Sequence, residues 1–176
     1  KKAAAHIQLD ENGEFVRNPK EDLVKVAVVE RHQGTGNVAC GFLKGYGIKE
    51  GAVALSVAHD SHNIIVVGVN DEEMEFAVNS LIAQEGGIVL VKEGKVIEQM
   101  PMPIAGLMSD QSGEWVDEKL TSIHEKAYTE LGICGDVEPV MTLCFMSLAV
   151  IPEIKLTDMG LFDVTTFSFI PVEISR

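Results

Sequence analysis

The amino-acid sequence predicts an α+β fold, a mixed and largely antiparallel β-sheet covered by two main helices. Apolar residues recur at helical spacing in two segments, 71–84 and 112–132. Several shorter runs are rich in valine and isoleucine and have the length of strands. Short turns join several of these runs, which favours antiparallel pairing because a parallel connection needs a longer crossover.

The predicted strands are short apolar runs bounded by glycine or polar residues. They cover 23–30, 38–43, 52–57, 64–69, 88–92, 95–100, 141–151 and 166–172. The run at 64–69 is almost wholly apolar, which is typical of a strand buried on both faces. Glu93 and Gly94 indicate a tight hairpin between two of the runs. Because the helix at 71–84 follows one strand and precedes another, we expect parallel pairs around it.

Each predicted helix has sequence signals at its ends. The first has Asn70 as N-cap, with Glu73 three residues later as in a capping box, and a glycine pair after its last turn. The second has a cap near Ser112 and ends at Gly132. These signals support helices at both apolar stripes.

The chain divides into a polar lead-in or linker at 1–21 and a packed domain at 22–176. The lead-in contains two turn signals, Asn12-Gly13 and Asn18-Pro19, and has room for one short hairpin. A length of 176 residues fits one ordinary domain. Since the chain does not begin with methionine, we expect it to be a piece of a longer protein.

Charge and apolar run length argue against nucleic-acid binding and against a membrane span. With 27 acidic against 14 basic side chains and a formal net charge of -13, the chain would repel a nucleic-acid backbone. The longest nearly apolar stretch, 140–151, is shorter than the roughly 18 residues that a membrane span requires. The three cysteines form no Cys-x-x-Cys pair and sit in or beside apolar runs. We expect them to be reduced core thiols of a cytoplasmic protein.

The segment 56–63, Ser-Val-Ala-His-Asp-Ser-His-Asn, is the densest group of functional side chains in the chain. It places His59, Asp60, Ser61, His62 and Asn63 between two apolar strands, where a rigid scaffold can aim side chains at a ligand. An imidazole beside a carboxylate could shuttle a proton or bind a metal ion. The same residues could also form an ordinary turn whose side chains cap their own backbone.

A second polar cluster, at 30–37, follows the first strong strand and contains Arg31 and His32. These two side chains could bind an anionic or carbonyl group, with nearby glycines allowing a close backbone approach. The sequence favours the alternative, a hairpin turn with a surface ion pair. The segment 101–110 contains two prolines, so it is extended and either lines a pocket or crosses the end of the sheet.

Histidine spacing argues against a metal site built by this chain alone. The histidines are His6, His32, His59, His62 and His124, and no His-x-His pair is present. A hydrolytic metal site usually takes three or more protein ligands. The two histidines of the 56–63 segment could contribute only if a tight turn brought both imidazoles together. We therefore expect no metal ligands in this chain.

Five motifs in a fixed order give the sequence a specific resemblance. They are ERHQGTGN (30–37), GFLKGYGIKEGA (41–52), SVAHDSHNIIVVG (56–68), PIAGLMSD (103–110) and VIPEIKLTDMGLFDV (150–164). Together they closely resemble the C-terminal domain of bacterial adenine deaminase, from about residue 22 to residue 172. The resemblance implies a cytoplasmic, homo-oligomeric enzyme of purine salvage that hydrolyses adenine to hypoxanthine and ammonia.

The resemblance also implies manganese or iron held by an N-terminal amidohydrolase barrel. This chain has no room for a barrel of roughly 250 residues, so we expect it to be inactive in isolation. The residues expected to act on adenine are His59, Asp60 and His62 as catalytic residues, and Ser61, Asn63, Arg31 and His32 as substrate-binding residues. Two alternatives stay open, a non-catalytic scaffold or oligomerisation module and an independent small metallohydrolase.

Overall fold

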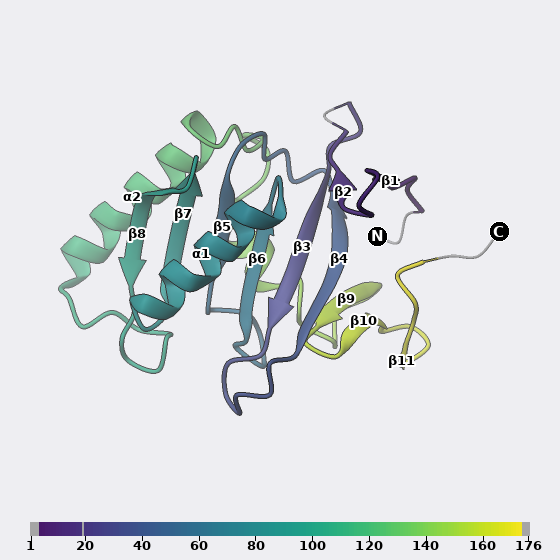
Figure 1. The fold of residues 1–176 in the computed structure, drawn as a ribbon. Coiled ribbons are helices and arrows are strands. Elements are labelled where there is room, and N and C mark those ends of the chain that lie inside the picture. The colour runs from purple at the N-terminus through teal and green to yellow at the C-terminus, as the bar shows by residue number, and fades with distance from the viewer. Residues whose placement is uncertain (1–3, 19, 174–176) are drawn as a thin grey trace.

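A six-stranded antiparallel sheet forms the centre of the fold in the computed structural model, which describes residues 4–18 and 20–173. The α+β class predicted from the sequence is confirmed (Figure 1). The strand order is β4-β3-β6-β5-β7-β8. The strands are β3 (Leu23–Val29), β4 (Val38–Lys44), β5 (Ala52–Leu55), β6 (Ile64–Gly68), β7 (Gly87–Lys92) and β8 (Lys95–Pro101).

The expected parallel pairs around the first helix are wrong. Strands β6 and β7, which flank that helix in the chain, run in the same direction but do not touch. β5 lies between them and pairs antiparallel with both. Because β5 already pairs with β6, the crossover through the first helix passes over β5. The chain then re-enters the sheet as β7, on the other side of β5.

Three helices cover the two faces of this sheet (Figure 1). Helix α1 (Asp71–Ala83) packs on one face, while α2 (Gly113–Thr129) and α3 (Pro139–Cys144) lie on the other. The predicted caps Asn70 and Ser112 are confirmed, since each side chain accepts a backbone N–H at the start of its helix. Alternating side chains of β3 separate the two cores: Val26 joins the α2 side and Ala27 the α1 side.

A short hairpin of β1 (Gln8–Leu9) and β2 (Phe15–Val16) lies in the expected lead-in. The Phe15 ring packs against Phe42 of β4, with ring centroids 5.0 Å apart. The lead-in therefore contacts the edge of the central sheet. Parts of the expected lead-in and domain, residues 1–3, 19 and 174–176, lie outside the described residues.

The predicted strand at 141–151 is wrong, because the segment forms α3 and the turns that follow it. Glu138 caps α3 by accepting the N–H of Met141. The buried residues Val140, Leu143, Cys144 and Ser147 follow helical spacing. A run that is apolar on nearly every position cannot by itself distinguish a short buried helix from a buried strand.

A small three-stranded sheet follows α3 and packs beside β4. It consists of β9 (Ile154–Thr157), β10 (Gly160–Asp163) and β11 (Ser168–Phe169), in the order β11-β10-β9. The predicted strand at 166–172 is thus reduced to two residues, and the β9–β10 hairpin was not predicted. Strands of four residues are too short to show a clear alternation of apolar and polar positions.

The cysteines do not all lie in the core as expected. Cys144 is buried in α3, whereas Cys40 and Cys134 are exposed. Cys40 lies on edge strand β4, on a part of the sheet that α1 does not cover, and Cys134 lies in the loop after α2. All three are free thiols. Within the described residues, no helix has both the length and the apolar character needed to cross a membrane.

Candidate functional site

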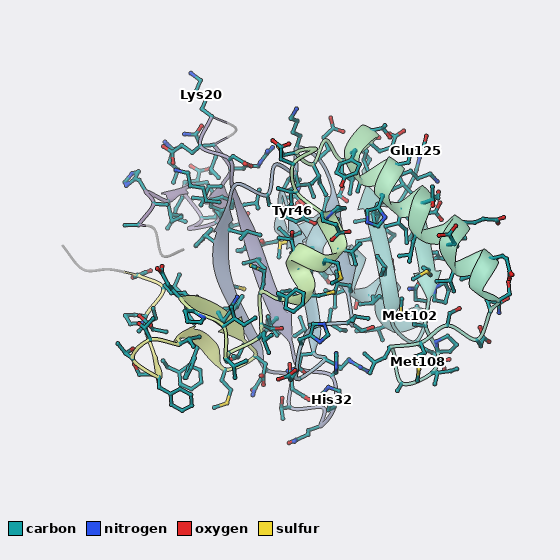
Figure 2. All side chains as sticks on the ribbon, turned by 180° about the vertical axis from the view of Figure 1, so that it is seen from behind. Lys20, His32, Tyr46, Met102, Met108 and Glu125 are labelled. Atoms are coloured by element: carbon teal, nitrogen blue, oxygen red, sulfur yellow. The ribbon has the colours of Figure 1, made fainter. Side chains whose placement is uncertain are left out.

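Three loops meet at one end of the central sheet. Strands β3, β5 and β8 all finish at this end of the sheet. The segments that follow them, 30–37, 56–63 and 101–108, therefore lie together. His32 and Met108 mark two of these segments in Figure 2. The segment 101–108 crosses the end of the sheet, which was one of the two alternatives left open by its prolines.

The backbone of His59, in the middle loop, is bonded to the last residue of α3 and to the turn that follows it. Its N–H donates to the carbonyl of Cys144 at 2.9 Å, and its own carbonyl accepts the Ser147 hydroxyl at 3.1 Å. The half-buried ring lies against Phe145, with centroids 5.0 Å apart. In the part of the chain that the structure describes, its ring nitrogens make no hydrogen bond. The backbone is fixed, and the imidazole is left available to a ligand.

His62 lies beside His59, with ring centroids 5.5 Å apart. The N–H of His62 donates to the carbonyl of Ala58 at 2.6 Å, which closes the tight turn that a pair of imidazoles requires. Nδ1 of His62 is buried and has no partner among the described residues. Burial lowers the pKa of His62, and the neighbouring His59 and Arg31 lower it further. The ring is therefore a neutral imidazole at neutral pH.

The other polar residues of this loop have different surroundings. Asp60 and Ser61 are exposed, and the Ser61 carbonyl accepts a hydrogen bond from Nε2 of His32 at 2.6 Å. Asn63 is buried, and its Oδ1 accepts the backbone N–H of Arg31 at 3.3 Å. The loop thus presents one carboxylate to solvent and uses its amide to hold the neighbouring loop.

Arg31 joins all three loops through backbone carbonyls. Its Nε–H donates to the carbonyl of His62 at 2.5 Å, and an Nη2–H donates to that of Ala105 at 2.9 Å. A Cβ on Gly106 would lie 3.0 Å from Nη1, so a side chain there would crowd the guanidinium. The expected hairpin is confirmed, but Arg31 bonds to these carbonyls where a surface ion pair was expected. Burial lowers the pKa of Arg31, which nevertheless stays charged.

Glu30 organises the loop that carries Arg31 and His32. Its carboxylate accepts the backbone N–H groups of His32, Gln33 and Thr35 at 2.5, 2.8 and 3.0 Å. These hydrogen bonds, of which the one from Thr35 is the strongest influence, lower the pKa of Glu30 to about 2. The conformation of the loop 30–37 is thus held by backbone N–H groups that donate to one carboxylate.

Ser56 locks the middle loop to the segment after β8. The fully buried hydroxyl donates to the carbonyl of Gly106 at 2.5 Å and accepts the N–H of Gly87 at 2.8 Å. A Cβ on Gly86 would lie 2.5 Å from Cα of Gly106. Glycine is therefore required where these two backbones approach one another.

Sequence reasoning missed the residues that support His59 and Arg31. Phe145 and Ser147 come from a segment predicted to be a strand, and Ala105 acts only through its carbonyl. A helical pattern at 140–147 was the one signal that could have placed Phe145 and Ser147 at a helix end. No sequence signal marks a carbonyl as an acceptor for a distant arginine.

The residues present do not fit a manganese or iron centre. Among residues 4–18 and 20–173, no group of three or more His, Cys, Asp or Glu side chains could hold a metal ion. A cavity of about 290 Å³ between α1 and the β3–β4 hairpin contains none of the predicted site residues in its walls. The predicted site therefore consists of two partly buried imidazoles and the exposed carboxylate of Asp60, on a loop held by hydrogen bonds.

The fold and this loop cluster define an α+β domain that carries two adjacent imidazoles and a carboxylate at the end of an antiparallel sheet. The family model described as "Adenine deaminase C-terminal domain" matches residues 1–168. The chain belongs to this family.

Curated relatives agree with this assignment. Adenine deaminase 2 of Desulfotalea psychrophila is 70% identical over 98% of the chain and 30% of its own length. Adenine deaminases of Nitratidesulfovibrio vulgaris and Ligilactobacillus salivarius are 52% and 51% identical over 94% and 96% of the chain, and 28% and 29% of their own lengths. The chain thus spans only about 30% of the length of these relatives.

Proposed function

We propose that the full-length protein containing this chain hydrolyses adenine to hypoxanthine and ammonia, and that this domain supplies residues at the mouth of the active site. One observation carries the role of the domain. His59 and His62 form an imidazole pair whose backbone is held by hydrogen bonds, while the ring nitrogens described above lack partners among residues 4–18 and 20–173. The names of the relatives supply the reaction.

This hydrolysis requires proton transfer. A water oxygen replaces the exocyclic amine at C6 of adenine; one water proton leaves with the amine as ammonia and the other stays on hypoxanthine. A neutral imidazole can accept a proton and return it, and the lowered pKa of His62 keeps that ring neutral. We propose that His59, Asp60 and His62 contact adenine or move these protons.

Ser61, Asn63, Arg31 and His32 are proposed to border the substrate. Arg31 and Asn63 would act through the loop, because their polar atoms bond to its backbone or hold the neighbouring loop. Manganese or iron would be held by the part of the protein that precedes this chain. The complete protein is proposed to be a homo-oligomer of purine salvage. It is also proposed to be cytoplasmic, which the free cysteines support.

The experiment replaces His59 and Asp60 by alanine, one at a time, in the full-length protein. We expect kcat/KM for adenine to fall at least tenfold, about 1.4 kcal/mol, with unchanged metal content. His6→Ala and Asp117→Ala, at exposed positions elsewhere, are the matched controls.

A non-catalytic scaffold is the second candidate, favoured by the many backbone hydrogen bonds that hold the loop. A decrease within about threefold, under ~0.7 kcal/mol, for both variants would assign the loop this structural role.

A further inference from the structure

An exposed aromatic cluster lies on the small C-terminal sheet. The ring centroid of Phe162 is 5.3 Å from that of Phe167 and 5.2 Å from that of Phe169. Phe167 is 78% exposed and Phe169 is 52% exposed. Large apolar side chains gathered on one surface mark an interaction site more often than scattered ones do.

Further exposed apolar residues lie at both ends of the small sheet. Met159 lies in the β9–β10 turn, and Val150 and Ile151 precede β9. The turn at 150–153 is joined to the end of β10, because the N–H of Val164 donates to the carbonyl of Glu153 at 2.8 Å. We name the surface formed by Val150, Ile151, Met159, Phe162, Phe167 and Phe169 the aromatic face.

Phe167 has an unfavourable backbone conformation as well as an exposed ring. Its φ is 52°, in the left-handed region that a bulky side chain rarely adopts. Glycine or asparagine would suit a solvent-facing turn at this position better. Neither burial within the domain nor backbone preference explains a phenylalanine here, but a partner that covers the ring does.

The two faces of the small sheet have different roles. Leu156 and Leu161 are cross-strand partners on the inner face, and both lie within van der Waals distance of a Cβ placed on Gly41 of β4. Lys155 and Phe162 are partners one position along, so they share the outer face. The inner face fixes the small sheet to the domain. On the outer face Lys155 is buried, whereas Phe162 lies against the exposed rings of Phe167 and Phe169.

The aromatic face continues into the candidate functional site. Lys155 donates from Nζ to the carbonyl of Phe145 at 3.0 Å, and the Phe145 ring lies against His59. Figure 2 shows the small sheet at the same end of the molecule as His32. The aromatic face is therefore linked to the imidazole pair through Lys155 and Phe145.

We propose that the aromatic face is the surface on which the preceding part of the full-length polypeptide docks, through an apolar surface of its own. This inference rests on the proposed function, which assigns the metal-bearing barrel to that part. The matched segment is the C-terminal domain and covers 30% of the Desulfotalea relative, so most of that relative's polypeptide precedes the corresponding segment. Hairpin β1–β2, through which the chain enters, and the small sheet both lie beyond β4 (Figure 1). One docked body can thus be joined to the lead-in, cover the aromatic face and hold adenine against His59.

The test compares the full-length protein with its Phe167→Ser/Phe169→Ser variant by hydrogen exchange and adenine turnover. We expect segments of the preceding part and β9–β11 to exchange at least tenfold faster in the variant, and kcat/KM to fall at least tenfold at unchanged metal content. Ile82→Ser, at an exposed apolar position on α1, is the matched control and should change neither. Unchanged exchange throughout the preceding part would overturn the proposal.

Phe167→Gly keeps the test independent of folding. Glycine suits φ of 52°, so this variant should keep the thermal unfolding midpoint of the domain while it accelerates exchange at the docked surface. If light scattering instead showed that the serine variant only separates two copies of the protein, the face would be a self-association surface and the proposal would be wrong.

The proposed function is tested separately from this docking. His59→Ala should lower turnover without faster exchange in the preceding part. If His59→Ala left adenine turnover unchanged while the serine variant still accelerated exchange, the docking proposal would be supported and the proposed role of the imidazole would be wrong.

Discussion

The Nε–H of Arg31 donates to the backbone carbonyl of His62 at 2.5 Å, across 31 positions of sequence. The same guanidinium donates to the carbonyl of Ala105, so one side chain fixes three loops relative to each other. None of these bonds uses an imidazole nitrogen. The loop cluster therefore has a backbone held by hydrogen bonds, and Arg31 leaves the ring nitrogens of His59 and His62 unused.

Replacing Arg31 with lysine is expected to impair this arrangement. The lysine ammonium lacks the planar fork that lets arginine donate to two carbonyls at once. In the full-length protein we expect kcat for adenine to fall about tenfold, or ~1.4 kcal/mol, with a smaller change in KM. Steady-state kinetics on Arg31→Lys measures this.

Arg17→Lys is the matched control, because Arg17 also donates to two backbone carbonyls, those of Ile48 and Lys49, away from the loop cluster. Equal effects of the two lysine variants on kcat would contradict a specific positioning role for Arg31.

Removing the Ser56 hydroxyl is expected to destabilise the domain. Alanine at this fully buried position leaves the N–H of Gly87 and the carbonyl of Gly106 without their partner. Two buried polar groups that lose their hydrogen bonds lower the free energy of unfolding by about 2 kcal/mol. Urea unfolding of Ser56→Ala, beside Ser80→Ala on α1, measures the difference. A Ser56→Ala curve that overlays the unmodified protein would show that water replaces the hydroxyl without loss.

Much of the fold could be predicted from the sequence where local patterns agree with the final packing. Asn70 and Ser112 cap their helices as predicted, because a capping side chain acts on backbone groups only a few positions away. The prediction of a strand at 141–151 was wrong because the local pattern there does not determine the packing. Its apolar run suits either a helix or a strand, and the contact of Cys144 and Phe145 with the distant His59 loop lies beyond any local pattern.

In the candidate site, too, features set by neighbouring residues could be predicted and features set by distant contacts could not. The density of polar side chains indicated the 56–63 loop, and the structure places His59 and His62 together. The roles of the neighbouring residues could not be predicted, since the contacts of Arg31 and Asn63 with backbone atoms depend on strand order. The ends of β3, β5 and β8 lie at the same end of the sheet because each of these strands pairs antiparallel with β6 or β7.

Glu98 on β8 is expected to contribute strongly to the attachment of α2. Its buried carboxylate accepts hydrogen bonds from Lys119 at 2.8 Å and Ser122 at 2.5 Å. Burial alone would raise the pKa of Glu98, but the hydrogen bonds from Lys119 and Ser122 outweigh it and hold the pKa at about 2. Glu98→Gln should lower the free energy of unfolding at pH 7 by about 2 kcal/mol. Urea unfolding checks this against Glu118→Gln on the exposed face of α2; equal stabilities of the two variants would contradict it.

The loop that carries Arg31 and His32 is expected to weaken in acid because of Glu30. Hydrogen bonds from the N–H groups of Thr35 and its neighbours lower the pKa of Glu30 from 4.5 to about 2. A carboxyl group with a lowered pKa stabilises the folded state above its ordinary pKa, and this contribution is lost as the pH falls from about 4.5 towards 2. In Glu30→Gln that contribution is absent at every pH. The difference in unfolding free energy between the unmodified protein and Glu30→Gln should therefore be larger at pH 7 than at pH 3, as measured by urea unfolding with Glu11→Gln as the control. A difference that stays constant between the two pH values would show that the charge of Glu30 does not hold the loop.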